Sequence, residues 1–422
     1  MRVLVAGVST RAMAESAARS GFAVTAIDAF ADVDQHPSVD ARSLGACFSA
    51  EAAARESRGA ACDAVAYGAN FENHPDAIAM LSHGRTLWGN PPDVIRRVRD
   101  PRLLSEALRN RGLAAPVVCE EGRTKDAFGV RRSAFGVPGS GVLGSGVLGS
   151  GAEVLGSRVL GSRVLGSMVL RSGRSWLLKR YASGGGRGVR EWRDGMSVPA
   201  GAYLQELIAG APLSIVFAAA NRRAIPIGLT RQLVGDESFG ASGYQYCGNI
   251  LTAAGEDDQV LADARALADV VCDEFALVGV NGIDLILDSR LLYAVEVNPR
   301  WCASMELVER AYGLSVFRVH AAACRDGVLP DFSLEHVRRS APASGKAIVF
   351  ARRDVTVGDT STWLSAGEAH THEIRDVPKP GTHIRAGRPI CTVFATAGDS
   401  RACRDELVSS AQRVYAAVAA VL

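Results

Sequence analysis

The stretches GVNGIDLILD at 279–288 and LLYAVEVNPR at 291–300 decide the fold of the second half of this chain. The runs from Ile283 to Leu287 and from Leu291 to Val297 are apolar and rich in strand-forming residues, and three turn-forming polar residues separate them. Two apolar runs joined by a short polar segment predict a β-hairpin.

The polar side chains of this hairpin have a fixed spacing. Because side chains alternate between the two faces of a strand, Asp284, Glu296 and Asn298 share one face, and Arg300 joins them if the strand extends that far. A turn centred near Ser289 makes Asp284 and Glu296 diagonal neighbours, roughly 7 Å apart at Cβ. Carboxylates this close repel each other unless a cation lies between them. Two carboxylates and an amide predict a site for Mg²⁺, or for Mn²⁺ in its place.

A solvated strand face is the alternative interpretation of these carboxylates. The alternation places the apolar residues Ile286 and Ala294 on the same face, which favours a partly buried site over a solvated one. A Mg²⁺ ion in such a site keeps some of its waters and shares its coordination shell with substrate phosphates.

A glycine-rich loop lies upstream of the hairpin. Lys179 precedes Ser183-Gly-Gly-Gly-Arg-Gly188, and consecutive glycines let backbone N–H groups turn towards a phosphate without a Cβ in the way. The loop differs from a Walker A loop, in which the lysine follows the glycines. A flexible hairpin tip is the alternative interpretation.

Length and composition limit the class of protein. At about 150 residues per domain, 422 residues predict two to four domains. A net charge of +2, with 48% hydrophobic and 22% charged residues, gives no reason to expect a nucleic-acid or anionic-membrane partner. The nine cysteines include no C-x-x-C pair, and no uncharged apolar stretch is long enough to span a bilayer. We expect a cytoplasmic protein with core thiols.

The patterns of apolar and turn-forming residues along the chain predict four structural segments. Residues 1–100 alternate strands and helices as in a Rossmann-like domain, but the first turn has a single glycine where a dinucleotide fingerprint needs three. Residues 101–200 and 201–338 hold the glycine loop and the hairpin. Within the former, 136–172 repeat a GVLGS-like unit, which we expect to be a disordered insert. Residues 339–422 predict a small, β-rich, barrel-like domain.

The order of these motifs resembles the ATP-grasp superfamily, notably biotin carboxylase and D-alanine:D-alanine ligase. The resemblance rests on a strand with Lys179, the glycine loop, the strand YLQELI at 203–208, and the D…E-x-N-x-R hairpin. It covers roughly residues 1–338. It implies an α/β fold with a Rossmann-like pre-ATP-grasp domain, two α+β ATP-grasp lobes and the β-rich C-terminal domain.

The resemblance also implies roles for individual residues. Lys179, Ser183, Gly184, Gly185, Gly186 and Gly188 would bind ATP phosphates, Gln205, Glu206, Leu207 and Ile208 would bind adenine as a hinge, Asp284, Glu296 and Asn298 would bind Mg²⁺, and Arg300 would face the γ-phosphate and the acyl phosphate. One position departs from the family pattern. Family members often carry a lysine after an Asp near the start of the first lobe, whereas Pro101 and Arg102 follow Asp100 here. Arg102 is one candidate to replace that lysine.

The function that the resemblance implies is an ATP-dependent carboxylate–amine ligase acting through an acyl phosphate on small-molecule substrates. Motifs such as ANFENHP, LWGNPP and PGTHIRAGRPICTVFA are similar to those of carboligases linked to tetrahydromethanopterin-dependent one-carbon metabolism. Two alternatives stay open: a biotin-carboxylase-like subunit that activates bicarbonate, and a regulatory ATP-binding protein without turnover. Arg231 and the stretch YQYCGN at 244–249 are candidate substrate contacts. A homodimer is one candidate for the oligomeric state.

Overall fold

The computed structural model describes residues 1–119, 173–289, 291–364 and 373–419. The repeat insert expected at 136–172 lies outside these ranges, so the expectation of disorder stays untested. All nine cysteines are free thiols, and six of them are buried. None of the described helices is both long enough and apolar enough to cross a membrane.

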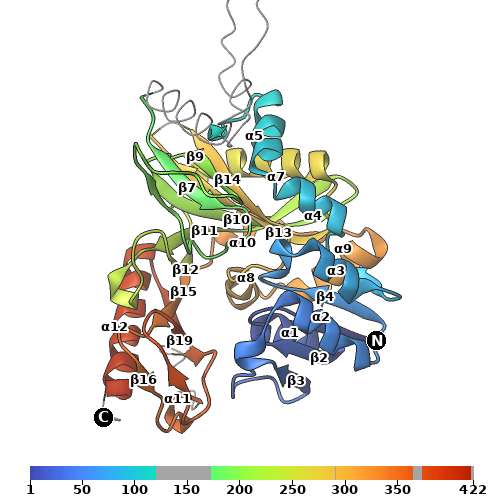
Figure 1. Cartoon of the computed structure of the whole chain (residues 1–422), viewed down its shortest axis with the longest axis vertical. Coiled ribbons are helices and arrows are strands. Elements are labelled where there is room, and N and C mark those ends of the chain that lie inside the picture. Colours follow the sequence, from blue (N-terminus) through green and yellow to red (C-terminus); the bar gives the residue numbers. More distant parts are fainter. Residues whose placement is uncertain (120–172, 290, 365–372, 420–422) are drawn as a thin grey trace, which may run out of the picture.

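The N-terminal region is a parallel α/β domain, as the sequence predicts (blue in Figure 1). Its five strands run in the order β3-β2-β1-β4-β5, and each pairs in parallel with its neighbour. The elements are β1 (Arg2–Ala6), α1 (Arg11–Arg19), β2 (Ala23–Asp28), β3 (Val39–Ser43), α2 (Ala50–Glu56), β4 (Ala64–Tyr67), a 3₁₀ turn η3 (Phe71–Asn73), α3 (Pro75–Ser82) and β5 (Thr86–Trp88).

Two helices and a four-stranded antiparallel sheet follow. The helices are α4 (Pro92–Val98) and α5 (Pro101–Asn110), and the sheet has the order β6-β9-β7-β8, with β6 (Val118–Cys119), β7 (Trp176–Arg180), β8 (Arg190–Trp192) and β9 (Ala202–Glu206). The glycine loop joins β7 to β8, so it is the tip of a hairpin in this first lobe.

The second lobe is built on a large, mainly antiparallel sheet with the order β14-β13-β10-β11-β12-β15-β19-β17. The elements up to residue 338 are β10 (Ala211–Ala220), β11 (Arg223–Val234), η4 (Glu237–Phe239), β12 (Tyr246–Leu251), α7 (Asp258–Phe275), β13 (Gly279–Leu287), β14 (Leu292–Asn298), α8 (Met305–Tyr312), α9 (Val316–Asp326) and α10 (Leu334–Arg338). The hairpin predicted from the sequence is β13–β14.

Both faces of this sheet are covered. Leu213, Ile215 and Phe217 of β10 belong to the apolar cluster that includes α7, whereas Val216 and Ala218 belong to the cluster formed with α8, α9 and the first domain. Because alternate residues of one strand enter two different cores, the strand is apolar along most of its length. Figure 1 shows α7 on one side of the sheet and α8 and α9 on the other.

The C-terminal segment continues the sheet of the second lobe. It contains β15 (Ala343–Phe350), β16 (Val355–Thr356), α11 (Ser361–Leu364), β17 (Ile374–Arg375), β18 (His383–Ile384), β19 (Pro389–Ala397) and α12 (Ser400–Ala419). The expected separate barrel-like domain is wrong in this respect, because β15 pairs with β12 and so extends the larger sheet. The sequence of this segment gives no sign that β15 pairs with a strand as distant in the chain as β12.

A buried ion network joins the first domain to the rest of the chain. Arg11 of α1 is fully buried and donates to Glu306 of α8 and to Asp376, each at 2.7 Å. Lys346 of β15 contacts the same Glu306 at 2.5 Å. Removing one partner of this network would leave a buried charge unpaired. The network therefore holds the first domain, the second lobe and the C-terminal segment in one arrangement.

Candidate active site

The register of the β13–β14 hairpin corrects the sequence prediction. Asp284 and Glu296 are direct partners across the two strands, instead of diagonal ones. The cause is a β-bulge: Leu285 pairs with Ala294, so Val295 is an extra residue on β14. Directly opposed side chains have Cβ atoms about 5 Å apart, which strengthens the repulsion between the two carboxylates. Ala294 packs with Leu285 in the apolar core, so it does not share the charged face as expected.

Asp284 is held by two amides. Gln232 of β11 donates to Oδ1 at 2.8 Å, and Asn298 donates to Oδ2 at 3.0 Å. Burial and the negative charge of Glu296 raise the pKa of Asp284 to about 6, against the opposing effect of these hydrogen bonds. The pKa of Asp284 stays raised because no cation among the described residues fully compensates its negative charge. A bound divalent ion would supply that positive charge.

Glu296, in contrast, faces two cations. Its Oε1 accepts a hydrogen bond from Arg99, and its Oε2 lies 3.6 Å from Nζ of Lys179. Burial alone would raise its pKa, but Arg99 and Lys179 lower the pKa of Glu296 to about 2. Glu296 is therefore ionised at neutral pH, and the two carboxylates of the pair have different electrostatic environments.

Arg99 is one of the site residues that sequence reasoning missed. It follows the end of α4, and its side chain is 11% exposed. Besides Glu296, it donates to the carbonyl of Val297 at 3.1 Å, to Asn73 Oδ1 at 3.1 Å and to the carbonyl of Ser183 at 3.4 Å. One guanidinium thus joins the hairpin, the first domain and the glycine loop. No local pattern marks a single arginine at the end of a short helix.

Arg102 does not reach this group of side chains. Asp100 is the N-cap of α5 and accepts hydrogen bonds from the backbone of Arg102 and Leu103, with Pro101 in the first turn. The side chain of Arg102 lies 3.4 Å from Asp100, its own N-cap. An N-cap Asp followed by Pro is a helix-start signal, so the sequence could have placed Arg102 in a helical turn. The cation nearest to Glu296 in this segment is Arg99.

Arg300 lies beside Asn298, although not through strand alternation. β14 ends at Asn298, and the chain turns so that Arg300 donates to Asn298 Oδ1 at 3.0 Å. Its Nε and Nη2 both donate to Oε1 of Glu72, at 2.9 and 2.7 Å. Burial alone would lower the pKa of Arg300, but Glu72 raises it, so the guanidinium keeps its charge. Glu72 and Asn73, adjacent in η3, hold the two site arginines.

The hinge strand positions the lysine. Lys179 is 7% exposed and donates to Gln205 Oε1 at 3.1 Å, while Gln205 Nε2 donates to the carbonyl of Val295, the bulge residue, at 3.1 Å. The next residue, Glu206, turns the other way, and its side chain accepts from Arg174 at 2.6 Å.

The N–H groups of Glu206 and Leu207 are used within the first lobe. They donate to the carbonyls of Val117 and Ser175, each at 2.8 Å. An adenine base would therefore have to meet the predicted hinge at other atoms, such as those of Ile208 beyond the end of β9.

The glycine loop is seated against the second lobe. The carbonyl of Gly185 accepts from the backbone of Tyr246 at 3.1 Å, and the carbonyl of Ser183 accepts from Asn73 at 3.2 Å. A cavity beside Glu296 is lined by Ser183, Arg99 and Tyr203, among others. The start of the loop, at Ser183, therefore lies at the same cavity as Glu296.

Gly186 is the tightest point of this seat, which yields a testable prediction. A Cβ on Gly186 would lie 1.7 Å from the carbonyl oxygen of Tyr244, and the residue has a φ of +73°. We expect Gly186→Ala to prevent the loop from seating and to lower kcat at least about tenfold, since closing elements exclude water and complete the site. The free energy of unfolding should change by about 1 kcal/mol or less, because the loop is a hairpin tip.

The matched comparison is Gly184→Ala, since a Cβ there meets nothing within 4 Å and its φ is not positive. Steady-state kinetics and thermal unfolding of both variants check the prediction. Equal losses in the two variants would contradict the role assigned to the contact between Gly186 and Tyr244.

The substrate contacts proposed from the sequence are only partly near this group. Arg231 points away from Asp284 and pairs with Asp257 at 2.8 Å. The stretch 244–249 enters β12, where Asn249 donates to Thr230 at 2.7 Å and accepts a hydrogen bond from Tyr246. Asn249 is the strand partner of Gln232, so this part of the stretch lies one strand away from the hydrogen bond to Asp284.

The oxygen donors of this site fit Mg²⁺, which also takes ligands from water and substrate. They do not fit a metal ion whose ligands all come from the protein. Among the described residues, no group of three His, Cys, Asp or Glu side chains is placed to hold a metal ion. Asp284, Glu296 and the amide of Asn298 offer hard oxygen ligands, and Mg²⁺ commonly takes its remaining ligands from water and substrate phosphates. The opposed carboxylates and the raised pKa of Asp284 agree with a cation site.

Comparisons with known proteins gave one family match over part of the chain and several similar folds. Residues 164–304 match the sequence model of the family described as ATP-grasp domain. A search of curated protein sequences gives no match. The fold is similar to the biotin carboxylase domain of 2-oxoglutarate carboxylase from Hydrogenobacter thermophilus, with a TM-score of 0.69 and 15% identity over 97% of this chain and 89% of that one.

Two further structures agree. N5-carboxyaminoimidazole ribonucleotide synthetase from Thermotoga maritima has a TM-score of 0.61 and 14% identity, with 97% of this chain and 98% of that chain covered. Biotin carboxylase from Campylobacter jejuni has a TM-score of 0.64 and 15% identity, with 96% and 89% covered. Residues 164–304 thus match an ATP-grasp domain, and the fold of nearly the whole chain is similar to those of these enzymes, which supports the resemblance and confirms the fold class predicted from the sequence.

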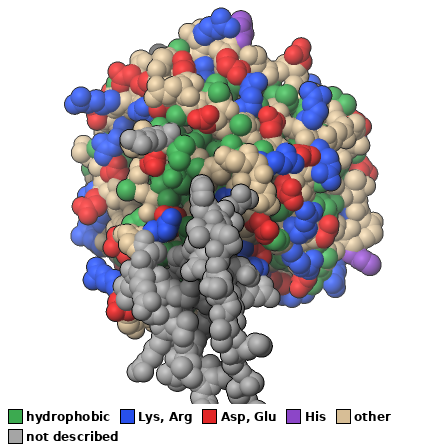
Figure 2. Space-filling view, turned by 90° about the horizontal axis from the view of Figure 1, so that it is seen from above, with side chains coloured by type: hydrophobic (Ala, Val, Ile, Leu, Met, Phe, Trp, Pro, Cys, Tyr) green, Lys and Arg blue, Asp and Glu red, His purple; other side chains and the backbone are tan. Residues whose placement is uncertain are grey.

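The surface agrees with the small net charge. Figure 2 shows acidic and basic side chains interspersed over the visible part of one face.

Proposed function

We propose that this chain is an ATP-dependent ligase that joins a small-molecule carboxylate to an amine through an acyl phosphate and releases ADP and phosphate. The observation that carries the proposal is the meeting of one buried and two partly buried cations with one pair of opposed carboxylates. The cations are Lys179, Arg99 and Arg300, and the carboxylates are Asp284 and Glu296. A group of this kind suits a polyphosphate whose negative charge changes during the reaction.

Asp284, Glu296 and Asn298 would hold the Mg²⁺ ion. When bound, the ion would neutralise phosphate oxygens. Lys179, fixed by Gln205, and Arg99, fixed by Asn73, would keep positive charge next to the same phosphates. The backbone N–H groups of the glycine loop would add hydrogen-bond donors to the same phosphates.

The proposed chemistry has two steps. An oxygen of the substrate carboxylate attacks the γ-phosphorus, the bond from that phosphorus to the ADP oxygen breaks, and ADP leaves. The nitrogen of the amine then attacks the acyl carbon, phosphate leaves, and the nitrogen gives up a proton to form the amide. Arg300 would stabilise the charge that develops on the transferred phosphoryl group, and the seated loop would keep water from the acyl phosphate.

Glu72 supports a place for the amine. Its Oε1 accepts both hydrogen bonds from Arg300, whereas its Oε2 is buried and has no hydrogen-bond partner among the described residues. A buried carboxylate oxygen without a partner is costly, and a substrate N–H group could satisfy it. We therefore assign Glu72 to the recognition of the amine beside Arg300.

Bicarbonate is a second candidate for the carboxylate. The similar protein from Hydrogenobacter thermophilus is described in complex with MgADP and bicarbonate, and the one from Thermotoga maritima is named for a carboxyamino product. Arg300 could bind the planar anion, as it could bind an organic carboxylate. The proposals differ only in the acid that is activated.

The experiment is an assay of ADP release with hydroxylamine as the amine, over a panel of carboxylic acids. Hydroxylamine traps an acyl phosphate as a hydroxamate, so the main proposal predicts equal amounts of ADP and hydroxamate with at least one acid. The bicarbonate proposal predicts bicarbonate-dependent ADP release without any organic acid. ATP binding without ADP release under either condition would contradict both and leave the regulatory alternative.

Two finer assignments stay proposals. A link to tetrahydromethanopterin-dependent one-carbon metabolism rests on the motifs quoted from the sequence, and acids and amines of that metabolism belong in the panel. A homodimer is proposed because the similar biotin carboxylase domain is described as a dimer. Sedimentation of the full chain tests the oligomeric state.

A further inference from the structure

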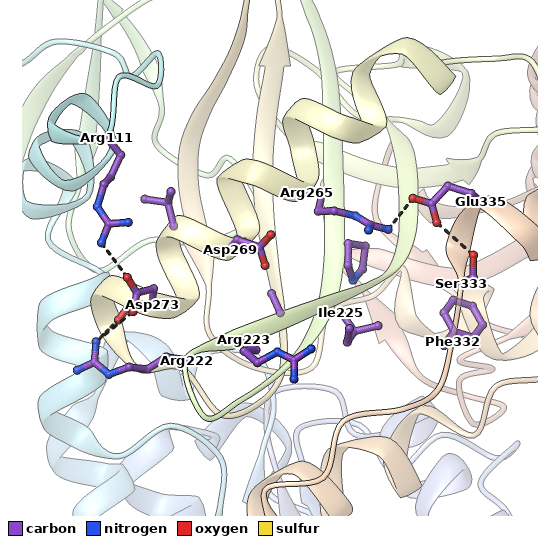
Figure 3. A pocket seen from close by; sticks show the side chains of 13 residues that line it. Arg111, Arg222, Arg223, Ile225, Arg265, Asp269, Asp273, Phe332, Ser333 and Glu335 are labelled. Atoms are coloured by element: carbon purple, nitrogen blue, oxygen red, sulfur yellow. Dashed lines mark hydrogen bonds and ion pairs between the residues drawn. The ribbon is translucent and has the colours of Figure 1, made fainter.

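A second cavity, with a volume of about 610 Å³, opens on the side of the second lobe that α7 covers (Figure 3). Its walls come from α7, the turn between β10 and β11, the end of α5 and residues 332–335. β11 carries Arg223 at this cavity and Gln232 at Asp284. Nine residues of a strand span roughly 30 Å, so the cavity is separate from the proposed ATP site.

The turn that forms one wall is rigid. Asn221 and Arg222 have φ values of +51° and +60°, as in the two-residue turns that join antiparallel strands with a right-handed twist. The side chain of Asn221 donates to the carbonyl of Gly327 at 3.0 Å. The positions of Arg222 and Arg223 are therefore set by a fixed backbone.

Three of the four arginines at the cavity are already neutralised. Asp273 accepts from Arg111 at 2.7 Å and from Arg222 at 3.3 Å. On the opposite wall, Arg265 contacts Glu335 at 2.5 Å, and Ser333 also donates to Glu335. The charges on these two walls are therefore already paired within the protein.

Arg223 is different. It is exposed, its carbonyl accepts a hydrogen bond from Cys272, and its guanidinium makes no hydrogen bond or ion pair within 4.0 Å with any residue that the structure describes. Figure 3 shows its side chain in the space between the Arg111–Asp273–Arg222 group and the Arg265–Glu335 pair. Burial raises the pKa of the remaining carboxyl group, Asp269, against the opposing effects of a backbone hydrogen bond from Ala224 and of the charges of Arg265 and Arg223.

The floor of the cavity is apolar. Ile225, Val270 and Phe332 line it and are only partly buried. A concave site with an apolar lining and a few placed polar groups is typical of small-molecule pockets, and this volume is within their usual range of about 300–1,000 Å³. A ligand that meets both features needs an anionic group and an apolar body.

We propose that this cavity binds a small organic anion, a carboxylate or a phosphate ester with an apolar or aromatic group, whose charge pairs with Arg223 and whose body covers Ile225, Val270 and Phe332. A divalent cation does not fit, because the described carboxylates here are paired with arginines or with backbone and form no metal-binding group. Nucleic acid does not fit, because neutralised arginines offer no run of free positive charge. The proposal is independent of the proposed function.

The test is titration calorimetry of the full chain with phenyl phosphate, benzoate, inorganic phosphate and benzamidine, with MgADP present in excess to occupy the nucleotide site. We expect phenyl phosphate or benzoate to bind saturably, which also tells the phosphate ester from the carboxylate. Inorganic phosphate, which lacks the apolar body, and the cationic benzamidine should bind at least about tenfold more weakly or not at all.

Arg223→Gln should weaken the binding of the organic anion at least about tenfold, since a hydrogen bond to a charged group is lost. Arg58→Gln, at another exposed arginine, should leave the affinity unchanged. Ile225→Glu is the second variant, because it keeps Arg223 and should abolish binding by repulsion. Absence of binding by both organic anions, equal binding to Arg223→Gln, or equal binding of benzamidine would overturn the proposal.

Discussion

Replacing Glu296 with glutamine is expected to lower kcat/KM for ATP by on the order of a thousandfold. Outer-shell groups around a metal commonly contribute 10–100-fold, and Glu296 would be a ligand itself. It is also the carboxylate that pairs with both Arg99 and Lys179, so its loss changes the charge of the whole phosphate site. Steady-state kinetics over a range of Mg²⁺ concentrations measure the effect.

Stability has to be followed in the same variant. The pKa of Glu296 is lowered to about 2, so the stability that its ionised form contributes is present above the unfolded pKa of about 4.3 and is lost as the pH falls towards 2. At pH 7 the variant lacks that contribution, and we expect the free energy of unfolding to fall by about 1–3 kcal/mol. Thermal unfolding would separate this loss from the loss of turnover.

Glu51→Gln is the matched control for Glu296→Gln. Glu51 pairs with His74 on the surface of the first domain, and its side chain is 40% exposed. We expect its kinetics to match those of the unmodified chain. A folded Glu296→Gln variant that keeps its Mg²⁺-dependent activity would refute the metal site.

Replacing Arg99 with glutamine is the second large effect that we expect, a loss of about a hundredfold or more in kcat/KM for ATP. The reason is the set of contacts that Arg99 makes with Glu296, Asn73 and Ser183, which no other described residue joins in this way. Removing one preorganised donor at a charged transition state typically costs 10²–10³-fold. The variant should also raise KM for ATP, because the glycine loop loses a contact.

Arg102→Gln is the comparison that separates the two candidates for the missing lysine of the family pattern. Because Arg102 contacts its own N-cap, Asp100, we expect a loss of less than about threefold. Arg99→Lys should recover part of the activity, since it keeps the charge but cannot make several directed hydrogen bonds at once. A larger loss in Arg102→Gln than in Arg99→Gln would reverse the assignment.

Much of the fold could be predicted from local patterns. The alternation of strands and helices in residues 1–100 and the β-hairpin of residues 279–300 were predicted from periodicity and turn residues, and the structure has both. Residues 164–304 match an ATP-grasp domain and the fold is similar to that of a biotin carboxylase domain, as the order of lysine, glycine loop, hinge and hairpin indicated. These features depend on residues close together in the sequence.

Other features could not be predicted in this way. The bulge at Val295 depends on how two strands pair, and it changed Asp284 and Glu296 from diagonal to direct partners. The pairing of β15 with β12 joins segments almost a hundred residues apart, so the barrel-like domain was wrong. The contact of Arg231 with Asp257 depends on the face of β11 that turns towards α7.

The sequence by itself determined the chemical groups of the site: paired carboxylates, an amide, a lysine before a glycine loop, and an arginine after the hairpin. Only the tertiary structure decided which charges meet. Arg99 and Glu72 contact Glu296 and Arg300, which lie about 200 residues later in the chain, and Asn73 holds Arg99 in place. Hydrophobic periodicity fixes local elements, whereas such ion pairs form only when the domains pack and exclude water from both partners.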